Sequence, residues 1–480
     1  MRGLMKHVDL KPLLLGLLAS SLTACAIGPD YKKPDAPIAP AYKEAGDWLS
    51  ATPSDEAQRG PWWEVFQDSQ LNELEQQVNI SNQTLAQAEA QYRQATALLR
   101  QTRAGFLPEV SVGGSAQRSG DGGGSTAVVG NRYTLSADAS WELDLWGRVR
   151  RSVEASAANA KASAADLASV RLSTQAQLAQ TYFQLRITDE QKRLLDDTVS
   201  GFERSLQLTQ NQYNVGVAAK ADVVQAQAQL KSAQAQAIDV SIQRAQLEHA
   251  IAVLVGKTPA EFSIAPAALL AVIPPATPPG VPSTLLERRP DIASAERRMA
   301  AANAQIGVAK AAYFPSLTIS ASGGFQSSSF SDWISLPSRF WSVGPSAAMT
   351  LFSGGARSAQ TDQAIAAYDQ NVAAYRQTVL GAFQEVEDNL VALHLLEQQA
   401  QVQNEAVIAA QQSATIATNQ YKAGTVSYLN VVSAQNTAYS NQRSALTILN
   451  SRLAASVALI KALGGGWHAD DDNAKPAETK

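Results

Sequence analysis

The sequence of 480 residues contains one cysteine, few aromatic residues and no basic excess. Because Cys25 is the only cysteine, no disulfide can form within the chain. Aromatic residues make up only 6%, so the helices are expected to have narrow apolar faces built from small side chains. The formal net charge of -4 gives no basic footprint of the kind that nucleic-acid binding requires.

Long apolar runs and catalytic patterns are also missing. No uninterrupted apolar run beyond the N-terminal region reaches the length of a transmembrane helix, so none is expected and a membrane-spanning chain would have to use strands. The histidines are widely spaced and form no His-Glu-x-x-His zinc pattern, and the sequence contains no Gly-x-Ser-x-Gly elbow. They are His7, His249, His394 and His468. The sequence therefore predicts no enzyme, no catalytic residue and no metal site.

The N-terminus has the pattern of an export signal. A positive region with Arg2, Lys6 and Lys11 precedes a short apolar run at 12–21, which cannot span a bilayer. Residues 1–24 are therefore expected to be cleaved, and Leu-Thr-Ala-Cys around Cys25 resembles a bacterial lipoprotein box. The resemblance implies diacylglycerol and N-acyl (palmitate) chains on Cys25, and the next residue, Ala26, favours sorting to the outer membrane. An ordinary signal cut near residue 24 beside an incidental cysteine is the alternative.

The rest of the chain repeats itself. Tyr213 in Gln-Tyr-Asn-Val-Gly returns as Tyr421 in Gln-Tyr-Lys-Ala-Gly, which is 208 residues later (421 minus 213). The segment that follows each of these turns returns at the same spacing. A period this long indicates two fused halves rather than a solenoid. We expect a first repeat at 70–256, a connection at 257–286 and a second repeat at 287–466, with an anchored extended segment at 25–69 and a disordered tail at 467–480.

Each half contains two segments with strand periodicity. Apolar and polar residues alternate over about 109–118, 132–146, 316–326 and 340–352. In the second of these, the polar face carries Asp138, Glu142 and Asp144. This alternation is typical of membrane-barrel strands, although two surface hairpins on a soluble domain would look similar. Pro345 removes a hydrogen-bond donor from the fourth segment and indicates a bulge or distorted strand end.

Four strands cannot close a barrel, because lipid does not tolerate open strand edges. Several chains must therefore share one barrel. Two chains would give a narrow lumen filled by side chains, whereas three would give twelve strands with room for a pore. The acidic polar face favours three.

Long helices are predicted beside the strands. Residues 148–213 and 355–421 contain no proline, and each stretch would form a helix of roughly 100 Å. Apolar residues in them follow heptad spacing, with small side chains that permit close helix packing. Shorter helices are expected at about 71–102 and 290–312. The fold class is therefore mainly α, a long coiled-coil α-barrel joined to a membrane β-barrel, with an internal two-fold repeat.

Several motifs together resemble the outer-membrane factor family of tripartite efflux and secretion systems, in its lipoprotein branch (TolC, OprM and NodT relatives). These motifs are Cys25 with Gly28-Pro29-Asp30-Tyr31-Lys32-Lys33-Pro34, Trp62-Trp63 with Phe66, Leu143-Asp144-Leu145-Trp146-Gly147-Arg148, Glu287-Arg288-Arg289-Pro290-Asp291-Ile292, Ala301-Ala302-Asn303-Ala304-Gln305-Ile306-Gly307 and Ala462-Leu463-Gly464-Gly465-Gly466-Trp467. The resemblance implies a homotrimer with a 12-stranded outer-membrane barrel and a periplasmic helical barrel. It also implies two partners, a periplasmic adaptor and an inner-membrane pump of the resistance-nodulation-division type.

The resemblance also implies a periplasmic gate near the two Tyr-x-x-Gly turns. Its candidate residues in this sequence are Asp222, Leu429, Asn430, Ser433, Tyr213 and Tyr421. Many relatives carry acids where Asn430 and Ser433 stand, so a strong acidic ring at the second turn is not expected. Asp222 also fits a helix N-cap, and the two roles are compatible.

The resemblance favours an outer-membrane channel that passively exports small molecules, such as drugs or toxic organic compounds. Metal efflux and type I secretion stay open, because the pump can select the cargo in such systems. A periplasmic coiled-coil scaffold lipoprotein that does not cross the outer membrane is the remaining alternative.

Overall fold

The structure is a computed structural model that describes residues 26–36, 41–43, 61–120, 129–267 and 288–467. Cys25, the expected signal peptide and all but the first residue of the expected tail lie outside the described residues. The chain divides into two compact units, which are described separately. Unit 1 comprises Met1–Asp35, Gln91–Ala164 and Ser294–Arg376, and unit 2 comprises Ala36–Ala90, Ala165–Ala293 and Gln377–Lys480.

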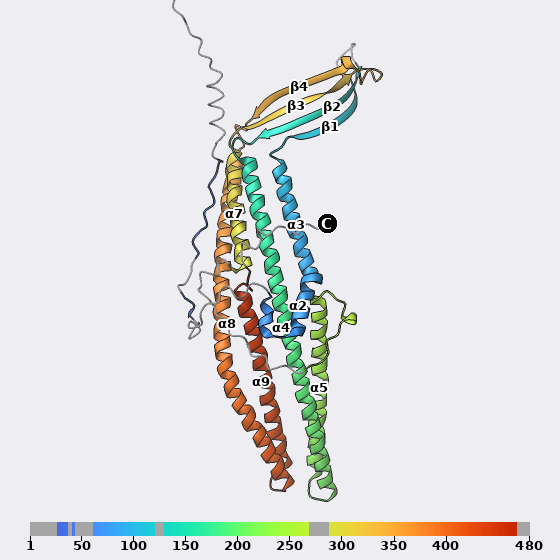
Figure 1. The fold of residues 1–480 in the computed structure, drawn as a ribbon, viewed down its shortest axis with the longest axis vertical. Helices are drawn as coiled ribbons and strands as arrows, with labels where there is room; N and C mark the ends of the chain where they lie inside the picture. The colour runs from blue at the N-terminus through green and yellow to red at the C-terminus, as the bar shows by residue number, and fades with distance from the viewer. Residues whose placement is uncertain (1–25, 37–40, 44–60, 121–128, 268–287, 468–480) are drawn as a thin grey trace, which may run out of the picture. The chain divides into compact units, whose positions relative to one another are not determined.

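Helices predominate among the described elements (Figure 1). In chain order they are η2 (Trp62–Phe66), α2 (Ser69–Ser81), α3 (Gln83–Ala104), β1 (Glu109–Gly120), β2 (Val129–Leu143), α4 (Arg148–Asn214), α5 (Lys220–Leu254), η3 (Pro259–Glu261), α7 (Pro290–Ala311), β3 (Ser316–Ser327), η5 (Leu336–Ser338), β4 (Arg339–Ala348), α8 (Ala356–Lys422) and α9 (Tyr428–Ala462). The elements of the first half recur in the second, which confirms the internal repeat.

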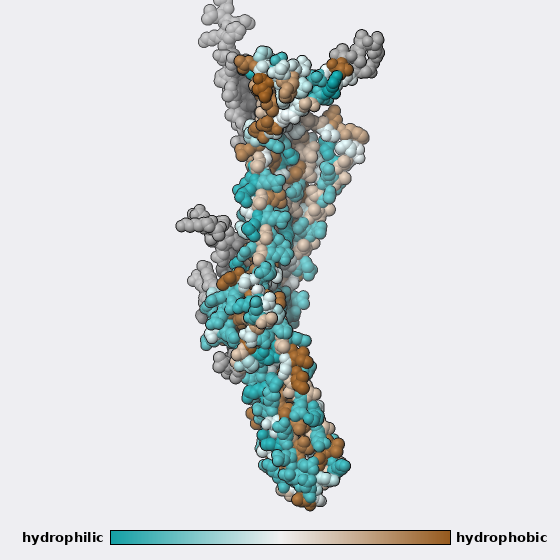
Figure 2. All heavy atoms as spheres, turned by 90° about the vertical axis from the view of Figure 1, so that its right-hand side faces the viewer, coloured by the Kyte–Doolittle hydropathy of each residue, from teal (hydrophilic) through white to brown (hydrophobic). Residues whose placement is uncertain are grey.

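Unit 1 contains one antiparallel sheet with the order β1-β2-β3-β4 (Figure 1). The register pairs Val112 with Ala137, Ala137 with Gly323, and Gly323 with Trp341. Residues paired across antiparallel strands lie on the same face, so the apolar sets of all four strands share one face and the polar sets share the other. Apolar side chains of the sheet such as Val112 and Trp341 are exposed, and Figure 2 shows hydrophobic residues, in brown, over this region. The described residues of the single chain therefore leave this apolar face uncovered.

Two strands end earlier than the alternating pattern predicts. β2 stops at Leu143 rather than 146, because Asp144 turns the chain into α4 and its carboxylate accepts hydrogen bonds from the backbone N–H groups of Val149 and Arg150, both at 2.8 Å. β4 stops at Ala348 rather than 352, because its partner β3 begins at Ser316, which pairs with Ala348. The prediction for both strand ends was wrong, because the sequence alternation continues past the turn at Asp144 in β2 and past the last partner of β4.

Unit 2 has the main hydrophobic core. Trp62, Trp63 and Phe66 of η2 pack with apolar side chains of α2, α4, α5 and α9. The single helix predicted at about 71–102 is in fact two helices, α2 and α3, which Asn82 separates. Asn82 has an extended backbone, and its side-chain oxygen accepts a hydrogen bond from the N–H of Leu85 at 3.0 Å, so it caps α3.

The helices of unit 2 form two hairpins, α4 with α5 and α8 with α9 (Figure 1). In the first hairpin, Phe202 of α4 packs with Leu230 and Ala233 of α5, as the heptad spacing predicts. α9 is also long and apolar enough, by length and composition alone, to cross a membrane. However, 44% of its apolar window is buried inside the fold, and α9 contributes to several hydrophobic clusters. We interpret α9 as a core helix of the bundle.

Candidate functional site

The two helix turns of unit 2 have the same backbone structure. Gly216 and Gly424 adopt φ angles of 77° and 74°, which glycine tolerates without strain. In the first turn the N–H of Val217 donates to the carbonyl of Gln212 at 2.8 Å, and in the second Thr425 donates to Gln420 at 3.0 Å. These hydrogen bonds satisfy the free carbonyls at the ends of α4 and α8, so the duplicated sequence produces a duplicated turn.

The side chains at the two turns differ. Tyr213 is 39% exposed, whereas Tyr421 is 7% exposed. Tyr421 packs against Tyr428 with ring centroids 5.4 Å apart, and its hydroxyl donates to Oγ1 of Thr209 at 3.3 Å. The first repeat has Lys220 at the place of Tyr428, 208 residues earlier (428 minus 220), so no second ring is available to cover Tyr213. The two candidate tyrosines therefore have different environments.

Tyr428 joins the two hairpins, and sequence reasoning missed it. It is buried with Tyr421, Val431 and Val432 of the second hairpin against Ala226 of the first. Burial raises the pKa of Tyr428 to about 12, and the nearby Tyr421 and Asp222 act in the same direction. The available signal was an aromatic residue directly after a turn, at a position where the other repeat carries a lysine.

Asp222 caps α5 from within the helix. The N-cap residue of α5 is Ala219, and Asp222 lies in the first helical turn, so the prediction of Asp222 as the N-cap was wrong. Its carboxylate accepts a hydrogen bond from the N–H of Ala219 at 3.3 Å, which is one half of a capping box. Ala219 has no side-chain oxygen for the other half. The Asp222 side chain is half-buried, so it caps the helix and still reaches solvent.

The other candidates lie at the start of α9. Leu429 is 65% exposed, and Asn430 and Ser433 are also exposed. None of these three side chains contributes to the cluster around Tyr428. Val215 and Val217 in the first turn are exposed as well. The described turns therefore present apolar, amide and hydroxyl groups to solvent, together with the carboxylate of Asp222 and the exposed ammonium groups of Lys220 and Lys422.

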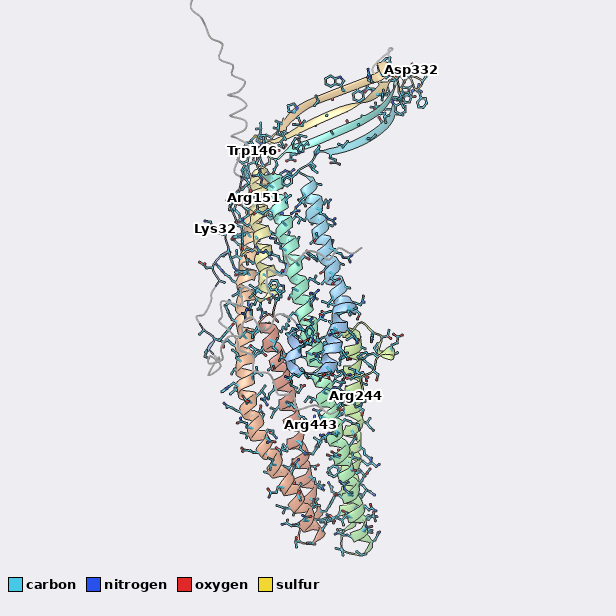
Figure 3. All side chains as sticks on the ribbon, in the orientation of Figure 1. Lys32, Trp146, Arg151, Arg244, Asp332 and Arg443 are labelled. Atoms are coloured by element: carbon cyan, nitrogen blue, oxygen red, sulfur yellow. The ribbon has the colours of Figure 1, made fainter. Side chains whose placement is uncertain are left out.

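The described chain starts beside the predicted lipid anchor. The N–H of Ile27 donates to the carbonyl of Trp146 at 3.2 Å, and Ala26 lies against Gly147, where a larger residue would collide with it. Arg151 is labelled in Figure 3, and its guanidinium forms an ion pair with Asp30 at 2.8 Å. These contacts hold the residue after Cys25 at the junction of β2 and α4 in unit 1.

The polar face of the sheet has its own hydrogen-bond network. The carboxylate of Asp138 accepts hydrogen bonds from the hydroxyls of Ser136 at 2.7 Å and of Ser322 on β3 at 2.6 Å. Glu142 and Arg148 form an ion pair near the helix junction. Among the described residues there is no group of three or more His, Cys, Asp or Glu side chains that could hold a metal ion.

Four amphipathic strands with two free edges, joined to long helical hairpins, define a subunit of a membrane channel. A family model described as outer membrane efflux protein matches residues 74–257 and 281–465. The chain belongs to this family of outer membrane efflux proteins.

Relatives match over nearly the whole chain. The toluene efflux pump outer membrane protein TtgC of Pseudomonas putida is 33% identical over 470 residues, which are 95% of this chain and 96% of TtgC. The cation efflux system protein CusC of Escherichia coli is 29% identical over 453 residues, which are 94% of this chain and 97% of CusC. The solved structure of the outer-membrane channel OprN superposes with a TM-score of 0.85 at 33% identity, and the match covers 92% of this chain and 100% of that chain.

The family membership confirms the resemblance that the sequence motifs indicate. The protein is an outer-membrane efflux channel protein that extends into the periplasm, and its class is a transport protein rather than an enzyme. This class favours the channel over a periplasmic scaffold.

Proposed function

We propose that three copies of this chain form one outer-membrane channel that exports small organic molecules, among them drugs and toxic compounds. In this proposal the channel receives its cargo through a periplasmic adaptor from an inner-membrane pump of the resistance-nodulation-division type. The channel itself is passive, because neither catalytic nor cofactor chemistry is required to let a solute diffuse through it.

The single observation that carries the proposal is the open sheet. Among the described residues, β1 and β4 each have one unpaired edge, and one face of the sheet is apolar along all four strands. In lipid, unpaired backbone groups cost several kcal/mol each, so the edges of neighbouring copies must pair. Twelve strands would enclose a lumen lined by the polar face, which carries Asp138 and Glu142.

The candidate gate follows from three-fold symmetry. Three Asp222 carboxylates would meet near the axis at the turns, and three Leu429 side chains would narrow the path beside them. The resting channel should therefore conduct poorly and prefer cations. The apolar contact of Tyr421 and Tyr428 with Ala226 ties the two hairpins together, so opening requires the hairpins to separate or to move as one body.

Planar-bilayer recordings of the purified channel test the gate. Asp222→Ala should lower cation selectivity and Leu429→Ala should raise the leak conductance, whereas Asn430→Ala and Ser433→Ala should change selectivity little. Asp222→Asn separates charge from capping, because the amide oxygen still accepts the hydrogen bond of Ala219. If Asp222→Asn keeps wild-type selectivity, the carboxylate acts only as a helix cap and the gate lies elsewhere.

The substrate class is proposed from the relatives. TtgC is named for toluene efflux and is the more similar of the two relatives described above, so organic cargo is favoured. CusC is named for cation efflux and matches over a similar length, which makes cations the second candidate. In a strain that lacks the chain, we expect susceptibility to organic solvents and drugs to rise while tolerance to metal cations stays unchanged. The opposite pattern would assign cations instead.

We also propose that Cys25 carries the lipid anchor. The contacts of Ala26 and Ile27 with the junction of β2 and α4 support a position for the preceding residue where the expected barrel leaves the membrane. Mass spectrometry of the mature N-terminus should find diacylglycerol and an N-acyl chain on Cys25. An unmodified N-terminus at another residue would refute this assignment.

A further inference from the structure

The charged residues of the sheet are sorted by face. In the described strands they are Glu109, Arg118, Arg132, Asp138, Glu142 and Arg339. The register places Glu109, Arg132, Asp138 and Glu142 on the polar face, where Arg132 pairs with Gln117 and Glu142 pairs with Thr318. The apolar face of these strands carries only Arg118 and Arg339, so both of its charges are positive.

Both arginines lie at the loop ends of their strands. Arg118 is two residues from the end of β1 and pairs with Asn131, and Arg339 is the first residue of β4 and pairs with Phe325. The helices of unit 1 join the opposite ends of the strands, while the loop that contains Asp332 joins β3 to β4 at this end (Figure 3). In an outer-membrane channel with periplasmic helices, this is the external end, so both arginines lie at the level of the outer leaflet.

Aromatic rings mark the same level. Tyr133 of the apolar face packs against Phe330 and Trp333 of the β3–β4 loop, with ring centroids 5.5 Å and 6.1 Å away. Phe330, Ile334 and Leu336 of this loop are largely exposed. Aromatic rings gather where the hydrocarbon of a membrane meets the headgroups. The two guanidinium groups are therefore expected at headgroup depth beside an aromatic belt.

The two arginines also lie on the two edge strands. In a closed barrel of several copies, β4 of one copy neighbours β1 of the next at about 4.8 Å. Arg339 of one copy and Arg118 of the next would then flank each boundary between copies. The Nε of Arg339 donates to the carbonyl of Leu336 at 3.2 Å, and the residue is exposed. Two guanidinium groups fit the oxygens of a phosphate.

We propose that each boundary between copies binds the phosphorylated headgroup of an outer-leaflet lipid through Arg339 of one copy and Arg118 of the next. The aromatic belt and the exposed apolar side chains of the sheet contact its acyl chains. Asp332 is the one carboxylate in the described part of the β3–β4 loop, and it opposes rather than supports anion binding. The lipid must therefore gain its affinity from both arginines together with the apolar contacts.

Native mass spectrometry of the detergent-purified protein tests this proposal with bisphosphorylated lipid A as the probe. Wild-type trimers should bind up to three lipids. The Arg118→Gln/Arg339→Gln double variant should bind them at least about tenfold more weakly, because hydrogen bonds to charged groups are lost at both positions. Arg132→Gln is the matched control, since it removes an arginine at the same end of the sheet but from the polar face. It should leave lipid binding unchanged.

Two further probes identify the source of the phosphate. Dephosphorylated lipid A should bind weakly, and inorganic phosphate at the same concentration should neither bind measurably nor displace the lipid. Equal binding of the phosphorylated and dephosphorylated lipids, displacement by inorganic phosphate, or unchanged binding in the double variant would each overturn the proposal. If the double variant does not assemble, the two single variants are measured instead, and each should weaken binding.

The lipid site rests on the multi-copy barrel proposed above. The same mass spectra distinguish failure of the lipid site from failure of the barrel. A trimer that does not lose lipid when the arginines are replaced counts against the lipid site alone. Protein that never forms trimers counts against the proposed channel.

Discussion

At the scale of single residues, Glu75 is an acid inside an apolar core. It is 0% exposed and lies on α2 between the buried side chains of Leu71, Leu74 and Val78. Within the part of the chain that the structure describes, neither of its carboxylate oxygens has a hydrogen-bond partner. Burial raises the pKa of Glu75 to about 9, so the side chain is protonated at neutral pH.

Glu75 should make the protein less stable as the pH rises. The folded pKa of about 9 exceeds the ordinary value of 4.5, so between these values the folded chain holds a proton that the unfolded chain has released. Raising the pH through this window then favours unfolding, by at most about 1.4 kcal/mol per pH unit. The measurement is thermal unfolding at pH 5 and pH 8. Wild-type protein should lose stability between them, and Glu75→Gln should lose much less.

The matched control for Glu75 is Glu73, an exposed acid two residues earlier on the same helix. Glu73→Gln should keep the wild-type pH dependence, because an exposed carboxylate has no desolvation to relieve. An equal pH dependence in wild type and Glu75→Gln would show that Glu75 is ionised or hydrated in the folded protein.

At the scale of elements, the repeat preserves close contacts as well as turns. Gly256 follows α5 with a φ of 69°, and Gly464 follows α9 with a φ of 96°. A Cβ at Gly256 would overlap the carbonyl oxygen of Ser81, and a Cβ at Gly464 would overlap that of Arg288. Each glycine therefore lets the end of one helix pass directly over the backbone that precedes another. Gly216 has a similar φ of 77°, but a Cβ there would contact nothing within the described chain.

Alanine substitutions at Gly216 and Gly256 distinguish the cost of backbone strain from the cost of steric overlap. Gly216→Ala should cost about 1–2 kcal/mol, because only the left-handed backbone is strained. Gly256→Ala should cost about 2–4 kcal/mol, because the backbone of residue 81 must also move. Chemical unfolding of the two variants under identical conditions compares the costs. Equal destabilisation would mean that the ends of α2 and α5 separate easily.

Periodicity alone predicted the type of each long element but not where it ends. The spacing of apolar residues, two residues in strands and 3.5 in packed helices, is a local property of the sequence. It therefore indicated both helical hairpins and all four strands. The ends depend on partners far away in sequence, such as Ser316 for β4, and on caps such as Asp144 for α4. For the candidate gate, the sequence correctly predicted the positions of both helix turns. It could not predict that Tyr421 is buried and Tyr213 exposed, because that difference depends on Tyr428.

The register also shows at which position of the sheet a buried charge should reduce the stability of the membrane-inserted protein most. Leu143, which alternation alone assigns to the lipid face, is the last residue of β2 and not its middle. Ala137 lies near the centre of β2 on the same face. Ala137→Arg should cost about 2–4 kcal/mol, and Leu143→Arg only about 0–1 kcal/mol near the interface. The measurement is unfolding of the lipid-reconstituted protein in denaturant.

The control for Ala137 is its neighbour Ser136, whose hydroxyl binds Asp138 on the polar face. Ser136→Arg should be milder than Ala137→Arg, since water and a carboxylate can accommodate the charge there. A larger loss for Ser136→Arg would mean that the two faces of the sheet are assigned the wrong way round.

At the scale of the whole molecule, the sheet predicts how many chains meet. Each chain offers one β1 edge and one β4 edge, so copies can only close in a ring in which every β4 meets the β1 of the next. Val112 on β1 and Val343 on β4 are both exposed, lie on the apolar face and are near the middle of their strands. In such a ring, cysteines at these two positions would lie on the same face of adjacent strands at every boundary between copies.

A chain with Val112→Cys and Val343→Cys should therefore form covalent trimers when treated with a bismaleimide that spans about two strand spacings. Since Cys25 is the only natural cysteine, the introduced thiols dominate the reaction. Denaturing gels should show one, two and three linked chains and nothing larger. The control chain carries Ala139→Cys and Ala321→Cys, which pair within one sheet and should link only inside the chain. A ladder that stops at two chains would indicate an eight-stranded barrel, and one that continues past three would exclude a closed trimer.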